Sequence, residues 1–151
     1  MAELTRDSVF ESINSIFTSM LGLELQASED ALETVSGAVK ITASVGLAGD
    51  WNGTAVLECS GEMACTLAGA MLMVEFDQVD DDVKDVIGEI TNMFAGNVAR
   101  LLPGSAALSP PCVVLGSEYS MEILKTKEAV KLPMVCNGKH LLVSVAVGAG
   151  S

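Results

Sequence analysis

One long helical pattern, between residues 79 and 104, constrains the fold of this chain most strongly. At about 100° per residue, its large apolar side chains fall within about 60° of one line, and they are Val86, Ile87, Ile90, Phe94, Val98 and Leu101. The acidic run VDDDVKD at 79–85 suits the positive end of a helix dipole, and Pro103 with Gly104 ends the helix. A helix with one apolar stripe has to pack on a second layer.

Further helices and strands are predicted on both sides of it. Helical spacing covers 7–21, after an Asp that could cap, and 61–73 reads as a short buried helix with Ser60 as its cap. Segments rich in Val, Thr and Ile predict strands at 34–47, 51–60, 112–124, 129–136 and 139–148. The tripeptide AGD joins the first two as a hairpin, and Asn137-Gly138 joins the last two. Pro133 indicates an edge or an irregularity in its strand.

This order of elements predicts one α+β domain over residues 1–151, with a largely antiparallel sheet covered by helices in two layers. Two of the helices share one spacing of Asp, Glu and Asn, at Asp7, Glu11 and Asn14 and again at Asp85, Glu89 and Asn92. That repeat suggests a weak internal duplication.

Composition excludes several classes of function. Twenty acidic and eight basic side chains give a net charge of −12, which repels nucleic acid and anionic membranes. No basic start with an apolar run marks a leader, and the apolar tract at 141–150 is half of a membrane span, so we expect a cytoplasmic protein. The four cysteines lack metal-ligand spacing and His140 is the only histidine, so we expect no metal and interpret the cysteines as core residues.

The face of the long helix opposite its apolar stripe carries the chemistry. It holds small and polar residues, namely Asp85, Gly88, Glu89, Asn92, Gly96 and Ala99. Each interior glycine costs a helix roughly 1 kcal/mol against alanine, so stability does not explain two glycines on a solvent-facing side. They are useful where another backbone or a partner protein approaches the helix closely. With no histidine or cysteine nearby, Glu89 and Asn92 form neither a strong nucleophile nor a metal site. Asn92 can hold a water, and Glu89 can pair with a cation on a partner.

The string DVIGEITNMFAGNVA at 85–99 resembles the signature of the CheC/CheX/FliY family of chemotaxis phosphatases. In that signature an Asp or Ser precedes Glu by four residues, Asn follows Glu by three, and a Pro comes later. SPPCVVLG at 109–116 is similar to the family's segment after the loop, and the single intact motif favours the CheX branch. Seventeen and eighteen residues (93–109 and 93–110) separate Asn92 from Pro110 and Pro111, a few fewer than is usual in the family.

The resemblance implies a phosphatase that dephosphorylates a CheY-type response regulator, with no cofactor of its own and with Mg²⁺ in the partner's receiver domain. Glu89 would pair with the regulator's active-site lysine, and Asn92 would orient the attacking water. Five further residues would contact the partner, namely Asp85, Gly88, Gly96, Ala99 and Pro111. A homodimer through sheet edges is also implied, and the apolar last strand at 141–147 could form it if that strand lies at an edge.

Other interpretations remain open. The chain could be a non-catalytic adaptor that docks a receiver, a receptor or a flagellar component, or a structural domain whose helix face forms a homodimer. Glu11 and Asn14 fit a degenerate second site, because the first helix lacks the AGN that follows the motif. Asn97 falls on the apolar side of its helix, so we expect a buried amide bonded to backbone. Trp51 and Tyr119 receive no role.

Overall fold

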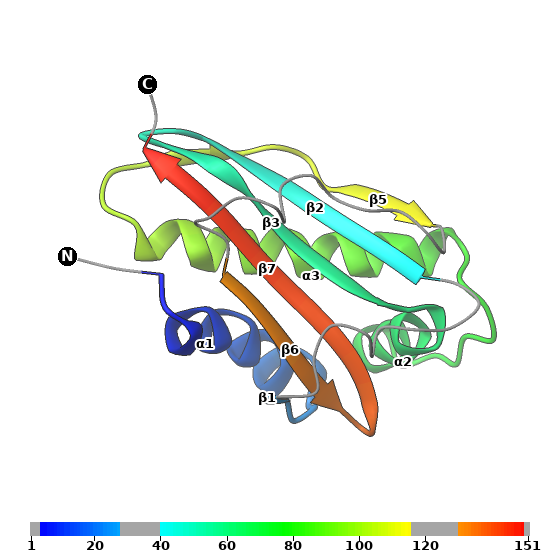
Figure 1. Cartoon of the computed structure of the whole chain (residues 1–151). Helices are drawn as coiled ribbons and strands as arrows, with labels where there is room; N and C mark the ends of the chain where they lie inside the picture. The colour runs from blue at the N-terminus through cyan, green and yellow to red at the C-terminus, as the bar shows by residue number, and fades with distance from the viewer. Residues whose placement is uncertain (1–3, 28–39, 116–129, 150–151) are drawn as a thin grey trace.

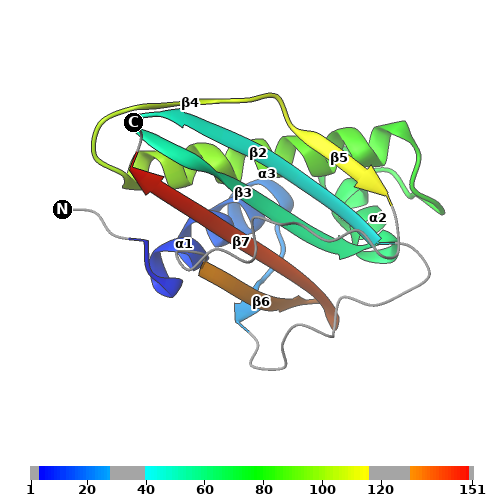
Figure 2. The ribbon, with the colours of Figure 1, turned by 45° about the horizontal axis from the view of Figure 1, so that its top comes forward.

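The computed structural model describes residues 4–27, 40–115 and 130–149. Its elements in chain order are α1 (Arg6–Ile16), the π-helical turn η1 (Phe17–Leu21), β1 (Gln26–Ala27), β2 (Lys40–Gly49), β3 (Trp51–Ser60), α2 (Gly61–Leu72), α3 (Asp81–Leu101), β4 (Ala106–Leu108), β5 (Cys112–Leu115), β6 (Val130–Cys136) and β7 (Lys139–Ala149). Figures 1 and 2 show α1, α2 and α3 on one face of the sheet. The predicted α+β arrangement is therefore confirmed. Tyr119 and the predicted strand portions at 34–39, 116–124 and 129 lie outside the described residues.

Every strand pair in the described sheet is antiparallel. The strand order is β1-β6-β7-β3-β2-β4, and β5 also pairs with β2. Both predicted hairpins are confirmed, since β2 pairs with β3 and β6 with β7. Asn137 and Gly138 have φ values of 53° and 75°, the left-handed pair that a two-residue hairpin turn of type I′ requires.

The position of β7 corrects one expectation. This strand pairs with β3 on one side, and from Lys139 to Val145 it pairs with β6 on the other, so most of it is interior and has no free edge for a second chain. Its apolar sequence instead reflects burial within the sheet. Within the described residues the interpretation of Pro133 is confirmed, because β1 pairs with Met134 and Val135 and no described strand pairs with Pro133 on that side of β6. Arg6 covers this edge by donating from Nη1 to the carbonyl of Lys131 at 3.1 Å.

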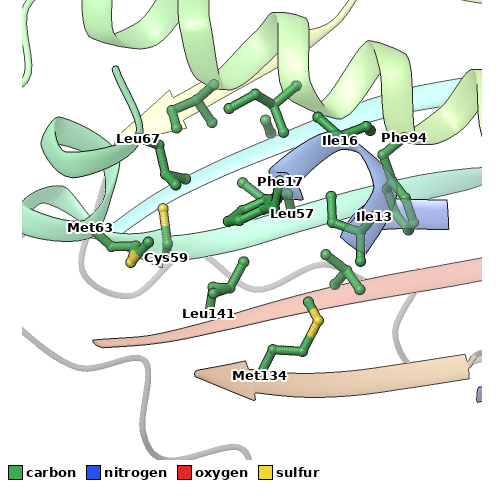
Figure 3. Packing of buried hydrophobic residues seen from close by; sticks show 14 of the residues in the cluster. Ile13, Ile16, Phe17, Leu57, Cys59, Met63, Leu67, Phe94, Met134 and Leu141 are labelled. Carbon is green, nitrogen blue, oxygen red and sulfur yellow. The ribbon is translucent and has the colours of Figure 1, made fainter. Parts of the chain in front are cut away.

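The core lies between the sheet and the three helices (Figure 3). Phe17 of η1, Leu57 of β3 and Phe94 of α3 are fully buried there. On the opposite face of the sheet, Val56 and Ser144 are buried as well, so the middle of the sheet is shielded from water on both sides.

Capping residues set the helix boundaries. Asp80 accepts a hydrogen bond from the backbone nitrogen of Val83 at 3.0 Å and starts α3 within the predicted acidic run. Ser60 caps α2 as predicted, accepting from Met63 N at 3.0 Å. The predicted cap of the first helix was wrong, because Thr5, with Ser8, forms a capping box there instead of Asp7.

The first helix also differs from prediction at its other end. It changes from α to π geometry at Phe17 and closes at Gly22, which has a left-handed φ of 66°. In the part of the chain that the structure describes, no helix is long and apolar enough to cross a membrane.

The cysteines are only partly core residues. Cys59 and Cys136 are buried, Cys65 is half-buried and Cys112 is exposed. The interpretation of all four as core packing was therefore wrong for Cys112, which lies at the start of the outer strand β5. Burial raises the pKa of the Cys59 thiol, with smaller contributions from Cys65 and Glu58.

Candidate functional site

Helix α3 presents Glu89 and Asn92 on its outward side. Its predicted stripe faces the core, and Ile87, Ile90 and Phe94 are fully buried. Glu89 is exposed and Asn92 half-buried, and residues three apart are neighbours on a helix surface. Among the described residues, no ion pair or side-chain hydrogen bond occupies either of them. The carboxylate and the amide are thus both available to a second molecule.

Gly88 does not belong to that exposed face. It is buried, and a Cβ built on it would lie 3.4 Å from Pro111 Cγ and 3.4 Å from Val113 Cγ2. The prediction that Gly88 leaves bare surface for a partner was therefore wrong. Its missing side chain lets the segment around Pro111 and β5 pack closely on α3, along which β5 runs in Figures 1 and 2. Helical periodicity predicted that α3 packs on one side only. In the structure the sheet covers one side of the helix, and the segment around Pro111 and β5 covers a second side.

Gly96 and Ala99 lie further along α3, and both are half-buried. Among the described residues, a Cβ on Gly96 would meet only Leu108 Cδ1, at 3.9 Å, which is ordinary contact. Because both residues are small, no long side chain protrudes from the surface of α3 at these two positions beyond Asn92. Asp85 is exposed one turn before Glu89.

Pro111 lies beside α3 although it is far from Glu89 in the sequence. Its ring packs at Gly88, the residue next to Glu89, and Pro111 itself is exposed. The structure therefore brings Pro111 together with Asp85, Glu89 and Asn92 at one surface, as the site prediction needs.

Asn97 fixes α3 against α1. Its Nδ2 donates to the carbonyl of Ser12 at 2.8 Å, and Arg100 donates to its Oδ1. The predicted bond from this amide to backbone is confirmed, although the residue is half-buried rather than fully buried. Sequence reasoning missed Arg100, whose position three residues later on the same helix was the available signal.

Glu11 and Asn14 on α1 repeat the exposure of Glu89 and Asn92, since Glu11 is exposed and Asn14 half-buried. The surroundings differ. The Asn14 carbonyl accepts from Thr18 Oγ1 at 3.0 Å, and the chain winds into η1 three residues after Asn14, whereas α3 continues as a regular α-helix to Leu101. A degenerate second site at Glu11 and Asn14 stays a prediction.

The chemistry of this surface is that of orientation. Among the described residues, no group of three or more His, Cys, Asp or Glu side chains is placed to hold a metal ion. Glu89 can accept charge-assisted hydrogen bonds from a lysine or arginine. Asn92 offers a donor and an acceptor that can hold a water in a set direction.

Comparison with known proteins gives consistent matches. The family model described as "Chemotaxis phosphatase CheX" matches residues 41–135. A Thermotoga maritima protein named "CheY-P phosphatase CheX" is 27% identical over 132 residues, which cover 84% of this chain and 81% of that protein.

Solved structures share the fold. The chemotaxis protein CheX from Vibrio vulnificus has a TM-score of 0.79 at 19% identity, covering 97% of this chain and 100% of that one. A second neighbour, in the CheX-CheY-BeF3-Mg complex from Borrelia burgdorferi, has a TM-score of 0.68 at 21% identity, covering 93% and 96%.

Proposed function

The chain belongs to the chemotaxis phosphatase CheX family, and we propose that it hydrolyses the aspartyl phosphate of a CheY-type response regulator. The observation that carries this proposal is the exposed Glu89, which has no ion-pair partner among the described residues, beside the half-buried Asn92 on α3. The relative from Thermotoga maritima bears the name of such a phosphatase. The relative from Borrelia burgdorferi was solved in complex with a CheY.

Asn92 supplies the catalytic orientation. Its amide holds a water in line with the bond between phosphorus and the aspartate oxygen of the regulator. The water oxygen attacks phosphorus, the bond to aspartate breaks, the aspartate leaves as a carboxylate, and the water's protons leave with the inorganic phosphate or pass to solvent. Orientation of the attacking water is most of what a protein adds to such a transfer, because phosphoryl transfer needs little covalent help.

Glu89 docks the regulator. Its exposed carboxylate has no cationic partner among the described residues and pairs with the active-site lysine of the receiver. A charge-assisted pair of this kind contributes to affinity and fixes the register of the two surfaces. The contact is surrounded by Asp85, Ala99 and Pro111. Gly96 adds no side chain that would protrude from the docking surface.

The regulator brings the divalent ion to this reaction. Mg²⁺ in the receiver neutralises charge on the phosphoryl oxygens, and this chain contributes Glu89 and Asn92 without a cofactor of its own. We propose the cytoplasm as the compartment, because cysteines without disulfide bonds suit a reducing environment. A homodimer remains part of the proposal, through an outer strand of the sheet, since β7 is interior.

The experiment compares Glu89→Ala and Asn92→Ala with the wild type on a panel of phosphorylated receiver domains from the same genome. The wild type shortens the phosphate lifetime of at least one receiver, and each variant slows that loss by about tenfold or more. Asn92→Ala retains more binding to the receiver than Glu89→Ala. Binding by the wild type without a shorter phosphate lifetime would identify an adaptor and contradict the proposal.

A further inference from the structure

The exposed large hydrophobic residues gather at one end of the molecule. Five are recorded among the described residues, and four of these are Leu72, Met73, Val74 and Leu115. Met73 is the extreme case, with 89% of its surface exposed. Single hydrophobic residues on a surface are normal, but a cluster rimmed by polar groups marks a place where another molecule binds.

Three of these residues line one groove. Met73, Val74 and Leu115 surround a volume of about 1120 Å³, together with Phe76 and Val79. The groove lies between α2, the connection from α2 to α3, and the end of β5. It therefore presents exposed apolar side chains, among polar ones, at the N-terminal end of α3.

The rim of the groove is negative. Glu62, Glu75 and Asp77 line it, and among the described residues Lys139 is its one cation. Lys139 pairs with Glu62 at 3.8 Å. Glu75 and Asp77 are exposed and take part in no ion pair between described residues. A partner surface complementary to this groove would carry an apolar side chain flanked by Lys or Arg.

The groove is close enough to Glu89 to contact the same partner. The lining of the groove reaches Val79, two residues before α3 begins at Asp81. Glu89 follows Asp81 by eight residues, which at 1.5 Å each is about 12 Å along the helix axis. A standard protein interface buries about 800 Å² per partner, which corresponds to a round patch of roughly 16 Å radius. A protein centred on Glu89 and Asn92 thus reaches the start of α3.

We propose that this groove is a second docking site for the same phosphorylated receiver, and that it takes an apolar side chain flanked by basic residues. The inference rests on the proposed function, because the occupant is the regulator that Asn92 acts on. Glu89 and the groove hold the receiver at two points, and Asn92 lies on the helix that connects them.

The test uses Met73→Asn and Val74→Ser in the full-length protein. Met73 has a left-handed φ of 60°, a conformation that asparagine adopts more readily than methionine, so the first variant removes the apolar anchor without straining the end of α2. Met20→Asn is the matched control, because Met20 is also exposed but does not line the groove. KM and kcat are measured with a CheY-type receiver that is phosphorylated by acetyl phosphate.

The expected result is a rise in KM of about tenfold for Met73→Asn, as for the loss of an anchor residue at an interface, with kcat within twofold of the wild type. Val74→Ser raises KM in the same direction, and Met20→Asn leaves both constants unchanged. An active wild type with unchanged KM in both groove variants overturns the inference alone. A change of solution mass in place of KM assigns the groove to a second copy of this chain and also overturns it. A wild type without effect on phosphate lifetime contradicts the proposed function, and this inference with it.

Discussion

At the scale of single residues, the two glycines of α3 differ in what their missing side chains permit. Gly88 lets the chain's own Pro111 and Val113 pack on the helix, whereas the place a Cβ would take on Gly96 has Leu108 as its one neighbour within 4 Å in the described part of the chain. Both weaken the helix relative to alanine. Only Gly88 has a packing contact that explains it, so Gly96 is the glycine whose bare surface suits a partner.

Gly96→Ala should therefore separate stability from activity. Its Cβ would sit 3.9 Å from Leu108 Cδ1, so the variant gains helix propensity without a clash. Its free energy of unfolding should rise by up to about 1 kcal/mol. Receiver dephosphorylation becomes slower because the added methyl group stands on the docking surface. Urea denaturation and a phosphate-release assay measure the two quantities, with Gly88→Ala as the comparison. A variant less stable than the wild type would show that the space around Gly96 is too small for a methyl group.

At the scale of elements, local patterns were enough to predict α2, α3 and both hairpins. Ser60 as a cap and Asn137-Gly138 as a turn act within a few residues of themselves, and so they can be read from the sequence. The short strand β4 and the two-residue strand β1 were missed, because each exists only through pairing with a distant strand. The π-helical turn at 17–21 was missed for a related reason, since its apolar residues fit a regular helix equally well.

The start of α3 gives a test at the same scale. Asp80 accepts from Val83 N at 3.0 Å, and losing such a cap costs about 1 kcal/mol. Asp80→Ala should lower the free energy of unfolding by that amount, as measured by thermal or urea denaturation. The matched control is Asp81→Ala, because Asp81 is nearly fully exposed in its pair with Lys84 at 3.4 Å, and such pairs contribute little. Equal losses in the two variants would contradict the capping role of Asp80.

At the scale of the whole molecule, the exposure of Glu89 and Asn92 was predicted correctly, and that of Gly88 was not. The motif placed Glu89 and Asn92 on the outward side of α3 correctly, because helical periodicity alone fixes which side faces the core. It placed Gly88 wrongly, because the cover over Gly88 comes from Pro111 and Val113, some two dozen residues further along the chain. Packing between distant segments is what periodicity leaves out.

Global stability should fall at alkaline pH. Burial raises the pKa of the Cys59 thiol far above its ordinary value of 9.0, so the folded state keeps a proton that the unfolded chain releases. Stability is therefore complete below about pH 9 and declines as pH rises further. Cys59→Ala should flatten that decline in urea denaturation between about pH 8 and 11, whereas Cys112→Ala, at an exposed thiol, should leave it unchanged. An equally steep decline in Cys59→Ala would assign the effect to other groups.

The central claim is that Asn92 orients the water that attacks the regulator's aspartyl phosphate. The most direct measurement is kcat for Asn92→Ala at a saturating concentration of a phosphorylated receiver that the wild type dephosphorylates. We expect kcat to fall by about tenfold or more, while binding to the receiver and the free energy of unfolding stay near the wild-type values. A variant with undiminished kcat would contradict it.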